Sequence, residues 1–165
     1  MLDIMSLLKD AAAFIMIGDG AIKEILQKKC NELNLGSAVF FHPSLDSERV
    51  IEVLASADIG VSLIEQHSKS YELALPSKVF EYRLAGLPVI SSPLKQVRDI
   101  FNEKAGIVFV HPDRSHELLN ACRLALQMSS DIELKTEIHV EAYNNYTLET
   151  DAKIFRNFLA QLPKF

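Results

Sequence analysis

Five short apolar runs do most to constrain what this chain can fold into. Apolar and polar residues do not alternate within them, so each run is typical of a strand that protein covers on both faces, as in a parallel sheet. The runs are Phe14–Ile17, Val39–Phe41, Ile59–Ile64, Val89–Ile90 and Ile107–Val110. We therefore predict five strands of a mostly parallel sheet.

Helical patterns separate these runs, because apolar residues recur there every three or four positions. The predicted helices contain residues 22–33, 50–54, 77–85, 94–101, 118–126 and 148–159, and the last one is expected to bury Ile154, Phe155, Phe158 and Leu159. Gly36 and Gly86 are expected to end helices. Asp46 or Ser47 is expected to cap the start of the second helix, and Ser92 followed by Pro93 to start the fourth. The polar stretch 129–145 is interpreted as helix plus loop.

Alternation of strand and helix predicts the fold class α/β, with a doubly wound, mostly parallel sheet and helices on both faces. One domain is expected over residues 1–165. Leu2, Met5 and Leu8 have helical spacing, although such a domain normally opens with a strand. We interpret the chain as a fragment whose first strand is missing, and expect residues 14–17 to pair directly with 59–64, or the chain to self-associate there.

Charge and composition exclude several classes of protein. The 165 residues carry 17 Lys and Arg against 22 Asp and Glu, a formal charge of −5, which argues against a general nucleic-acid or anionic-lipid surface. No apolar run approaches the ~18 residues that span a bilayer, and the start lacks the basic segment of a signal peptide. Cys30 and Cys122 are expected to be buried free thiols. A cytoplasmic protein is expected.

Ligands of open parallel sheets bind at the carboxyl ends of the strands, so the loops there are candidate sites. Gly18-Asp19-Gly20 follows the first run and precedes a helix, which favours an anion site built from backbone N–H groups. A tight turn without function is the alternative reading. His42 follows the second run and could border a ligand. No group of residues has metal-ligand spacing, and no signature of a nucleophilic hydrolase is present.

The connection after Ile64 is longer than most strand-to-helix loops, which favours a binding loop. It leads to a short helix that Ser77 can cap, and Lys78 and Glu81 share one face of that helix. A helix N-terminus with a lysine suits a diphosphate, and a carboxylate one turn deeper can accept hydrogen bonds from two neighbouring hydroxyls. The pattern fits a ribose diphosphate; a solvated Lys–Glu pair is the alternative.

Four segments in order resemble the carboxyl-terminal domain of group 1 glycosyltransferases, retaining enzymes of the GT-B fold (glycosyltransferase family 4). The segments are residues 13–20 (AFIMIGDG), 55–61 (ASADIGV), 75–82 (LPSKVFEY) and 85–90 (AGLPVI). The resemblance extends along nearly the whole chain, to the closing helix.

The resemblance implies a domain that holds a nucleotide-diphosphate sugar as co-substrate, without a metal or other cofactor. Glu81 would take the ribose hydroxyls, with Leu75, Pro76, Ser77 and Lys78 near the diphosphate and sugar. Gly18, Asp19 and Gly20 would lie near the donor, and His42 to Leu45 near the base. The acceptor would bind a separate amino-terminal domain that is missing here, so this chain alone is expected to be inactive. Any peripheral membrane association would come through that missing half.

The sequence departs from the family pattern at three places. The first glutamate of the family's E-x7-E motif would fall at Leu73, with Glu72 one position away; some relatives in bacterial surface-polysaccharide pathways also lack it. His42 stands where a glycine is usual, and the first strand with its basic residues is absent. Two alternatives to a transferase stay open: half of a nucleotide-sugar epimerase, and a non-catalytic module that binds a nucleotide or a partner.

Overall fold

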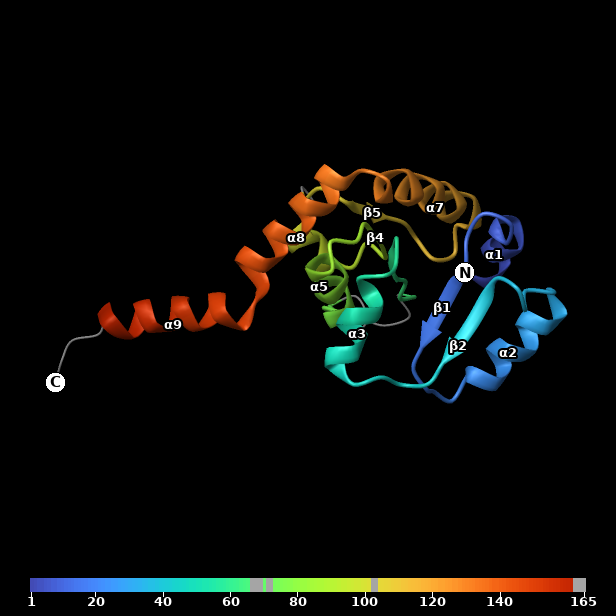
Figure 1. Ribbon diagram of the computed structural model, residues 1–165, viewed down its shortest axis with the longest axis horizontal. Coiled ribbons are helices and arrows are strands. Elements are labelled where there is room, and N and C mark those ends of the chain that lie inside the picture. Colours follow the sequence, from blue (N-terminus) through green and yellow to red (C-terminus); the bar gives the residue numbers. More distant parts are fainter. Residues whose placement is uncertain (66–69, 71–72, 102–103, 162–165) are drawn as a thin grey trace.

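The computed structural model describes residues 1–65, 70, 73–101 and 104–161, without the side chains of 47–48, 154–155 and 158–161. In this part of the chain the strands are β1 (Phe14–Ile17), β2 (Val39–His42), β3 (Gly60–Ser62), β4 (Val89–Ser91) and β5 (Ile107–Phe109). The helices are α1 (Leu2–Leu8), α2 (Lys23–Glu32), α3 (Ser47–Leu54), α5 (Ser77–Leu84), α6 (Lys95–Phe101), α7 (Ser115–Ser129), α8 (Ile132–Tyr146) and α9 (Leu148–Gln161). Strand and helix alternate as predicted (Figure 1).

The three-stranded sheet β3–β4–β5 is parallel and is covered by helices on both faces. Successive side chains of a strand point to opposite faces of the sheet, so neighbouring residues of the central strand β4 contact different helices. Ile90 packs against α1 and α7, in a cluster with Leu8 and Leu118. Val89 packs on the other face against α5 and α6, in a cluster with Val79 and other apolar residues. The predicted α/β fold class with parallel strands is confirmed.

Strands β1 and β2 form a second parallel pair. One face of this pair packs against α1 and α2 through Phe14 and Met16, in a cluster that contains Met5. The opposite face carries Ile15 and Phe40, which are cross-strand partners and are 55% and 47% exposed. The β1–β2 pair is therefore covered on one face only at these positions, unlike β4.

The predicted pairing of β1 with the strand at residues 59–64 is wrong. Within the described residues, β1 pairs with β2, and β3 pairs with β4, so the strands form two separate hydrogen-bonded groups. Helix α1 joins the groups through side chains instead. Met5 lies in the cluster under β1 and β2, whereas Ile4 and Leu8 lie in the cluster under β4. Its two apolar sides make direct strand pairing unnecessary for burial.

Helix ends follow the expected chemistry, with two corrections. Gly86, at φ +74°, ends α5 in a Schellman motif, with Gly86 N donating to Arg83 O and Leu87 N to Tyr82 O. At the end of α2, Asn34, not Gly36, takes the left-handed conformation (φ +53°) and the same motif forms. Helix α6 begins at Lys95, so Ser92 and Pro93 precede it rather than start it.

Several predicted helices differ in extent or burial. Residues 132–146 form one continuous helix, α8, where helix plus loop was predicted, and Asp131 caps it by accepting the Leu134 N–H at 3.0 Å. In α3, Asp46 takes the N-cap position. Ile22 and Ile25, in the predicted stripe of α2, are 60% and 67% exposed, because the buried side of that helix passes through Cys30.

Helix α9 extends away from the rest of the molecule (Figure 1), and the four side chains predicted to be buried on it lie outside the described residues. Cys30 and Cys122 are buried free thiols, as predicted. Among the described helices, none has the length and apolar character needed to cross a membrane.

Candidate functional site

The loops that follow β1 and β2 lie against each other. Gly18 has a φ of +133°, and its N–H donates to the His42 carbonyl at 3.0 Å. The Asp19 carboxylate accepts the Ser44 N–H at 3.2 Å and the Ser44 hydroxyl at 3.3 Å. It also pairs with the Lys23 ammonium at 2.6 Å. The glycine conformation and the Asp19 contacts give this edge a defined shape at the carboxyl ends of both strands.

The predicted anion role of this edge rests on its backbone, because Asp19 itself is acidic. The Lys23 ammonium, with the Ser44 backbone N–H, holds the pKa of the exposed Asp19 carboxyl below its ordinary value. Lys23 is therefore already engaged by a carboxylate. His42 is exposed, and its Nδ1 lies 2.8 Å from the Pro43 carbonyl.

Helix α5 carries the second group of predicted site residues. Pro76 occupies its N-cap position and Ser77 is its first residue, so the prediction that Ser77 caps the helix is wrong. Proline fits there because its φ of −68° suits the extended N-cap and it has no N–H to satisfy. Lys78 is exposed and Glu81 is half-buried, and neither has a hydrogen-bond or ion-pair partner in the described chain.

Close packing on β3 and β4 fixes this helix. Val79 is completely buried between α5 and the sheet. The Tyr82 ring lies directly on the backbone of β3, where a Cβ atom added at Gly60 would overlap it. The Tyr82 hydroxyl also donates to the Val61 carbonyl at 3.4 Å. Burial raises the pKa of Tyr82, and the neighbouring Glu81 charge adds to the rise.

The structure thus places the predicted residues in two groups. Gly18, Asp19, Gly20 and His42 lie together at the ends of β1 and β2, and the residues from Leu75 to Glu81 lie at the start of α5. In the described chain, no hydrogen bond or ion pair joins the two groups. Much of the long connection, including Glu72, lies outside the described residues.

Buried serines at the ends of β3 and β4 were not identified from the sequence. Ser91 and Ser92 are fully buried, and Ser62 is 6% exposed. The Ser92 hydroxyl accepts the Ile64 N–H at 2.8 Å, and Ser92 N donates to the Ser62 carbonyl at 3.1 Å. These bonds fix the first residues of the connection that leads to α5. The sequence signal was the pair Ser91-Ser92 directly after the apolar run Val89–Ile90, where we predicted a helix start at Ser92.

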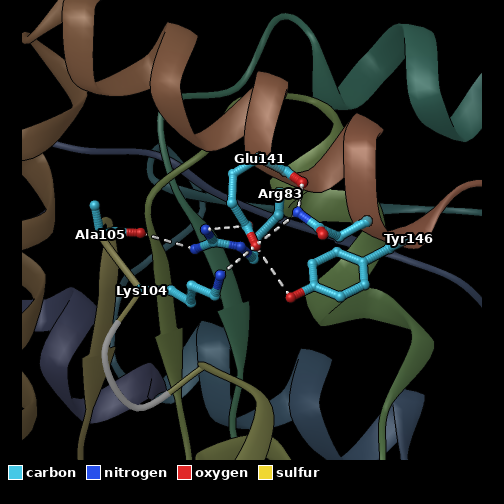
Figure 2. Close-up of polar contacts among 6 residues, drawn as sticks. Arg83, Lys104, Ala105, Glu141 and Tyr146 are labelled. Carbon is cyan, nitrogen blue, oxygen red and sulfur yellow. Dashed lines mark hydrogen bonds and ion pairs between the residues drawn. The ribbon is translucent and has the colours of Figure 1, made fainter.

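An ion-pair cluster around the buried Arg83 of α5 was also not identified (Figure 2). Arg83 is 1% exposed; it donates to the Ala105 carbonyl through Nη1 and to Glu141 Oε2 through Nη2, both at 2.9 Å. Glu141 Oε1 lies 3.0 Å from Lys104 Nζ and accepts the Tyr146 hydroxyl at 3.1 Å. The Arg83 guanidinium also stands over the Phe101 ring, 5.3 Å from its centre. The sequence signal was the position of Arg83 one turn after buried Val79.

Comparison with solved structures identifies the class of protein. Sucrose-phosphate synthase from Thermosynechococcus elongatus superposes with a TM-score of 0.72 at 18% identity, over 98% of this chain and 42% of that one. WaaG, a glycosyltransferase involved in lipopolysaccharide biosynthesis, gives a TM-score of 0.68 at 16% identity, over 93% and 41%. These likenesses show a Rossmann-like α/β domain of the GT-B kind.

Sequence comparison then identifies the family. Residues 1–128 match the family described as "Glycosyl transferases group 1". The chain belongs to the group 1 glycosyltransferases, as the resemblance indicated, and this favours the transferase over the epimerase alternative.

Individual relatives cover widely different shares of the chain. Chitobiosyldiphosphodolichol beta-mannosyltransferase of Dictyostelium discoideum is 36% identical over 65% of this chain and 21% of that protein. Vi polysaccharide biosynthesis protein VipC/TviE of Salmonella typhi is 25% identical over 93% of this chain and 26% of that protein. The chain thus spans about a quarter of the length of these relatives.

Proposed function

We propose that this chain is the donor-binding half of a retaining glycosyltransferase, which moves a sugar from a nucleotide-diphosphate sugar to an acceptor. The observation that carries the proposal is the pair Lys78 and Glu81, one turn apart on α5, which have no partner among the described residues. A surface ion pair between them was the alternative to a ligand role, and the described part of the chain contains no such pair. Family membership supplies the reaction class.

Each group then has a role that its chemistry suits. The Lys78 ammonium and the N-terminal end of the α5 dipole face the negative charge of the diphosphate and stabilise it as it leaves. The Glu81 carboxylate accepts hydrogen bonds from two ribose hydroxyls. The backbone at Gly18 to Gly20 and the ring of His42 border the donor from the β1–β2 edge. This proposal requires no metal or other cofactor.

The acceptor is bound, in this proposal, by a separate amino-terminal half, and transfer requires both halves. Bacterial surface-polysaccharide synthesis is the process that we propose, supported by the names of the Salmonella typhi relative and of WaaG. A second candidate is mannosyl transfer to a lipid-diphosphate glycan. It is supported by the higher identity, 36%, to the Dictyostelium discoideum enzyme.

Calorimetric titration of the chain with UDP and with GDP tests the donor role of Glu81. Glu81→Gln keeps the side-chain shape but replaces an ionised acceptor with a neutral one. Hydrogen bonds to charged groups contribute ~1.5–3 kcal/mol, so affinity for the preferred nucleotide should fall about 10- to 100-fold.

Glu137→Gln is the matched control, because Glu137 is an exposed glutamate on α8. It should leave affinity unchanged. Equal affinities of the wild type and Glu81→Gln would show that Glu81 is not the ribose acceptor. Failure of UDP, GDP and, titrated in the same way, ADP, CDP and dTDP to bind would refute the donor-binding proposal and favour the non-catalytic partner-binding module.

A further inference from the structure

Helix α8 runs in the opposite direction to α5 and contacts it from its C-terminal end back to Phe80. At the C-terminal end of α5, a Cβ atom added at Gly86 would lie 3.0 Å from the Lys135 carbonyl, and His139 Nδ1 lies 2.5 Å from the Leu84 carbonyl. One residue earlier along α5, Arg83 pairs with Glu141. In these contacts the residue numbers rise along α8 as they fall along α5, so the two helices are antiparallel.

The last contact of this pair lies beside the candidate site. The Tyr146 ring packs edge-on against Phe80, with ring centres 5.2 Å apart, and against Phe101 at 5.4 Å. Phe80 is the residue immediately before Glu81. Glu81 therefore lies on α5 between two residues that contact α8. Phe80 packs against Tyr146, and Arg83 forms an ion pair with Glu141.

The Glu141 carboxylate links these supports. Its Oε2 accepts a hydrogen bond from Arg83, and its Oε1 pairs with Lys104 and accepts the Tyr146 hydroxyl (Figure 2). Its own side chain is 18% exposed, and Arg83 is almost fully buried with its Nε unpaired. Removing the carboxylate would leave a buried guanidinium without a counter-charge, which is strongly destabilising, so we expect Arg83 and the part of α5 that carries it to shift.

We propose that Glu141 is a positioning residue for the donor-binding helix: by holding Arg83 and the Tyr146 hydroxyl, it sets the place of Glu81. This inference rests on the proposed function, because it assigns Glu81 to the nucleotide. Glu141 itself faces Arg83 and Lys104 and acts on the nucleotide only through α5. Small displacements of a positioned group lower affinity and rate, so we expect loss of Glu141 to lower the affinity for the nucleotide.

The test is a double-mutant cycle in nucleotide affinity, measured by calorimetry with UDP and GDP. Glu141→Gln in the wild-type chain should weaken binding about 3- to 10-fold, the size of coupling expected within one contact network. In the Glu81→Gln background the same change should weaken binding by less than about twofold, because the group that Glu141 positions is already altered. Glu137→Gln again serves as the control on the same helix.

Tyr146→Phe is a second, milder variant, which keeps the ring contacts with Phe80 and Phe101 and removes only the hydroxyl. It should fold and should weaken binding about twofold in the wild-type background alone. A fall in melting temperature for Glu141→Gln and Tyr146→Phe with unchanged affinity would overturn the positioning role. Equal losses in both backgrounds would overturn it too. An unchanged affinity of Glu81→Gln would also overturn it, because Glu81 would then not be the ribose acceptor, whereas failure of the nucleotides to bind the wild type would refute the proposed function itself.

Discussion

At the scale of single residues, Glu141 and Tyr146 shift each other's ionisation. Burial raises the pKa of Tyr146 to about 12, helped by the charge of Glu141 and by the hydrogen bond to it. Burial also tends to raise the pKa of Glu141, but hydrogen bonds from Arg83 and Lys104 outweigh it, so this pKa lies below its ordinary value. The carboxylate is therefore ionised and the phenol neutral at neutral pH.

We predict that the Tyr146 hydroxyl stabilises the fold in a limited pH range. Its folded pKa of about 12 lies above the model-peptide value of 10.0, so its contribution is full below pH 10 and is lost as the pH rises towards 12. The measurement is the free energy of unfolding of the wild type minus that of Tyr146→Phe, in urea, across this range. A difference that stays constant from pH 9 to pH 12 would contradict the prediction.

At the scale of elements, the site depends on how closely α5 approaches β3. Short helices have little stability of their own, and their place comes from packing. Tyr82 can lie on the β3 backbone because Gly60 has no side chain, and Val79 and Arg83 bury the same side of α5. Lys78, in the first turn of α5, stays exposed. The packing of one side of α5 thus determines which of its side chains remain accessible to a ligand.

We predict that Gly60→Ala lowers the free energy of unfolding by about 1–3 kcal/mol, the usual cost of adding atoms to a filled core. The new methyl group must displace the Tyr82 ring. Gly36→Ala is the matched control: it meets nothing within 4 Å and should change stability by less than about 0.5 kcal/mol. Urea unfolding followed by circular dichroism measures both, and equal effects would show that Tyr82 does not lie tightly on β3.

At the scale of the whole molecule, the two strand groups differ in how well they are covered. The β3–β4–β5 sheet has helices on both faces, whereas β1 and β2 expose Ile15 and Phe40. Apolar side chains of α1 contact both groups, and within the described residues no strand hydrogen bond joins them. Local opening takes less free energy where fewer apolar contacts are lost.

We predict that β1 opens before β4. The Phe14 N–H, bonded to Ala38 O at 2.7 Å, and the Val89 N–H, bonded to Gly106 O at 2.8 Å, are comparable bonds in different surroundings. Native-state hydrogen exchange, corrected for intrinsic rates, should show at least about tenfold weaker protection of Phe14, equivalent to ~1.4 kcal/mol in opening free energy. Equal protection would mean that both groups open together in one cooperative unit.

Much of the candidate site could be predicted because its residues are close in sequence. Gly18 to Gly20 follow an apolar run, and Lys78 and Glu81 are one helical turn apart, so local periodicity is enough to group them. The Asp19–Ser44 contact and the Ser92–Ile64 bond could not be predicted, because each joins residues 25 or more positions apart. Glu141 is 58 residues from Arg83, and nothing in the local pattern connects them.

The sequence by itself determined the α/β class, the order of strands and helices, and the free state of its two thiols, because apolar spacing and composition are local properties. Only the tertiary structure decided that β1 does not pair with β3, that Ile22 and Ile25 face outwards, and that Arg83 is buried. Those outcomes depend on which surfaces meet. A helix such as α1 can join two strand groups through its two apolar sides, and periodicity specifies that a side is apolar without specifying what covers it.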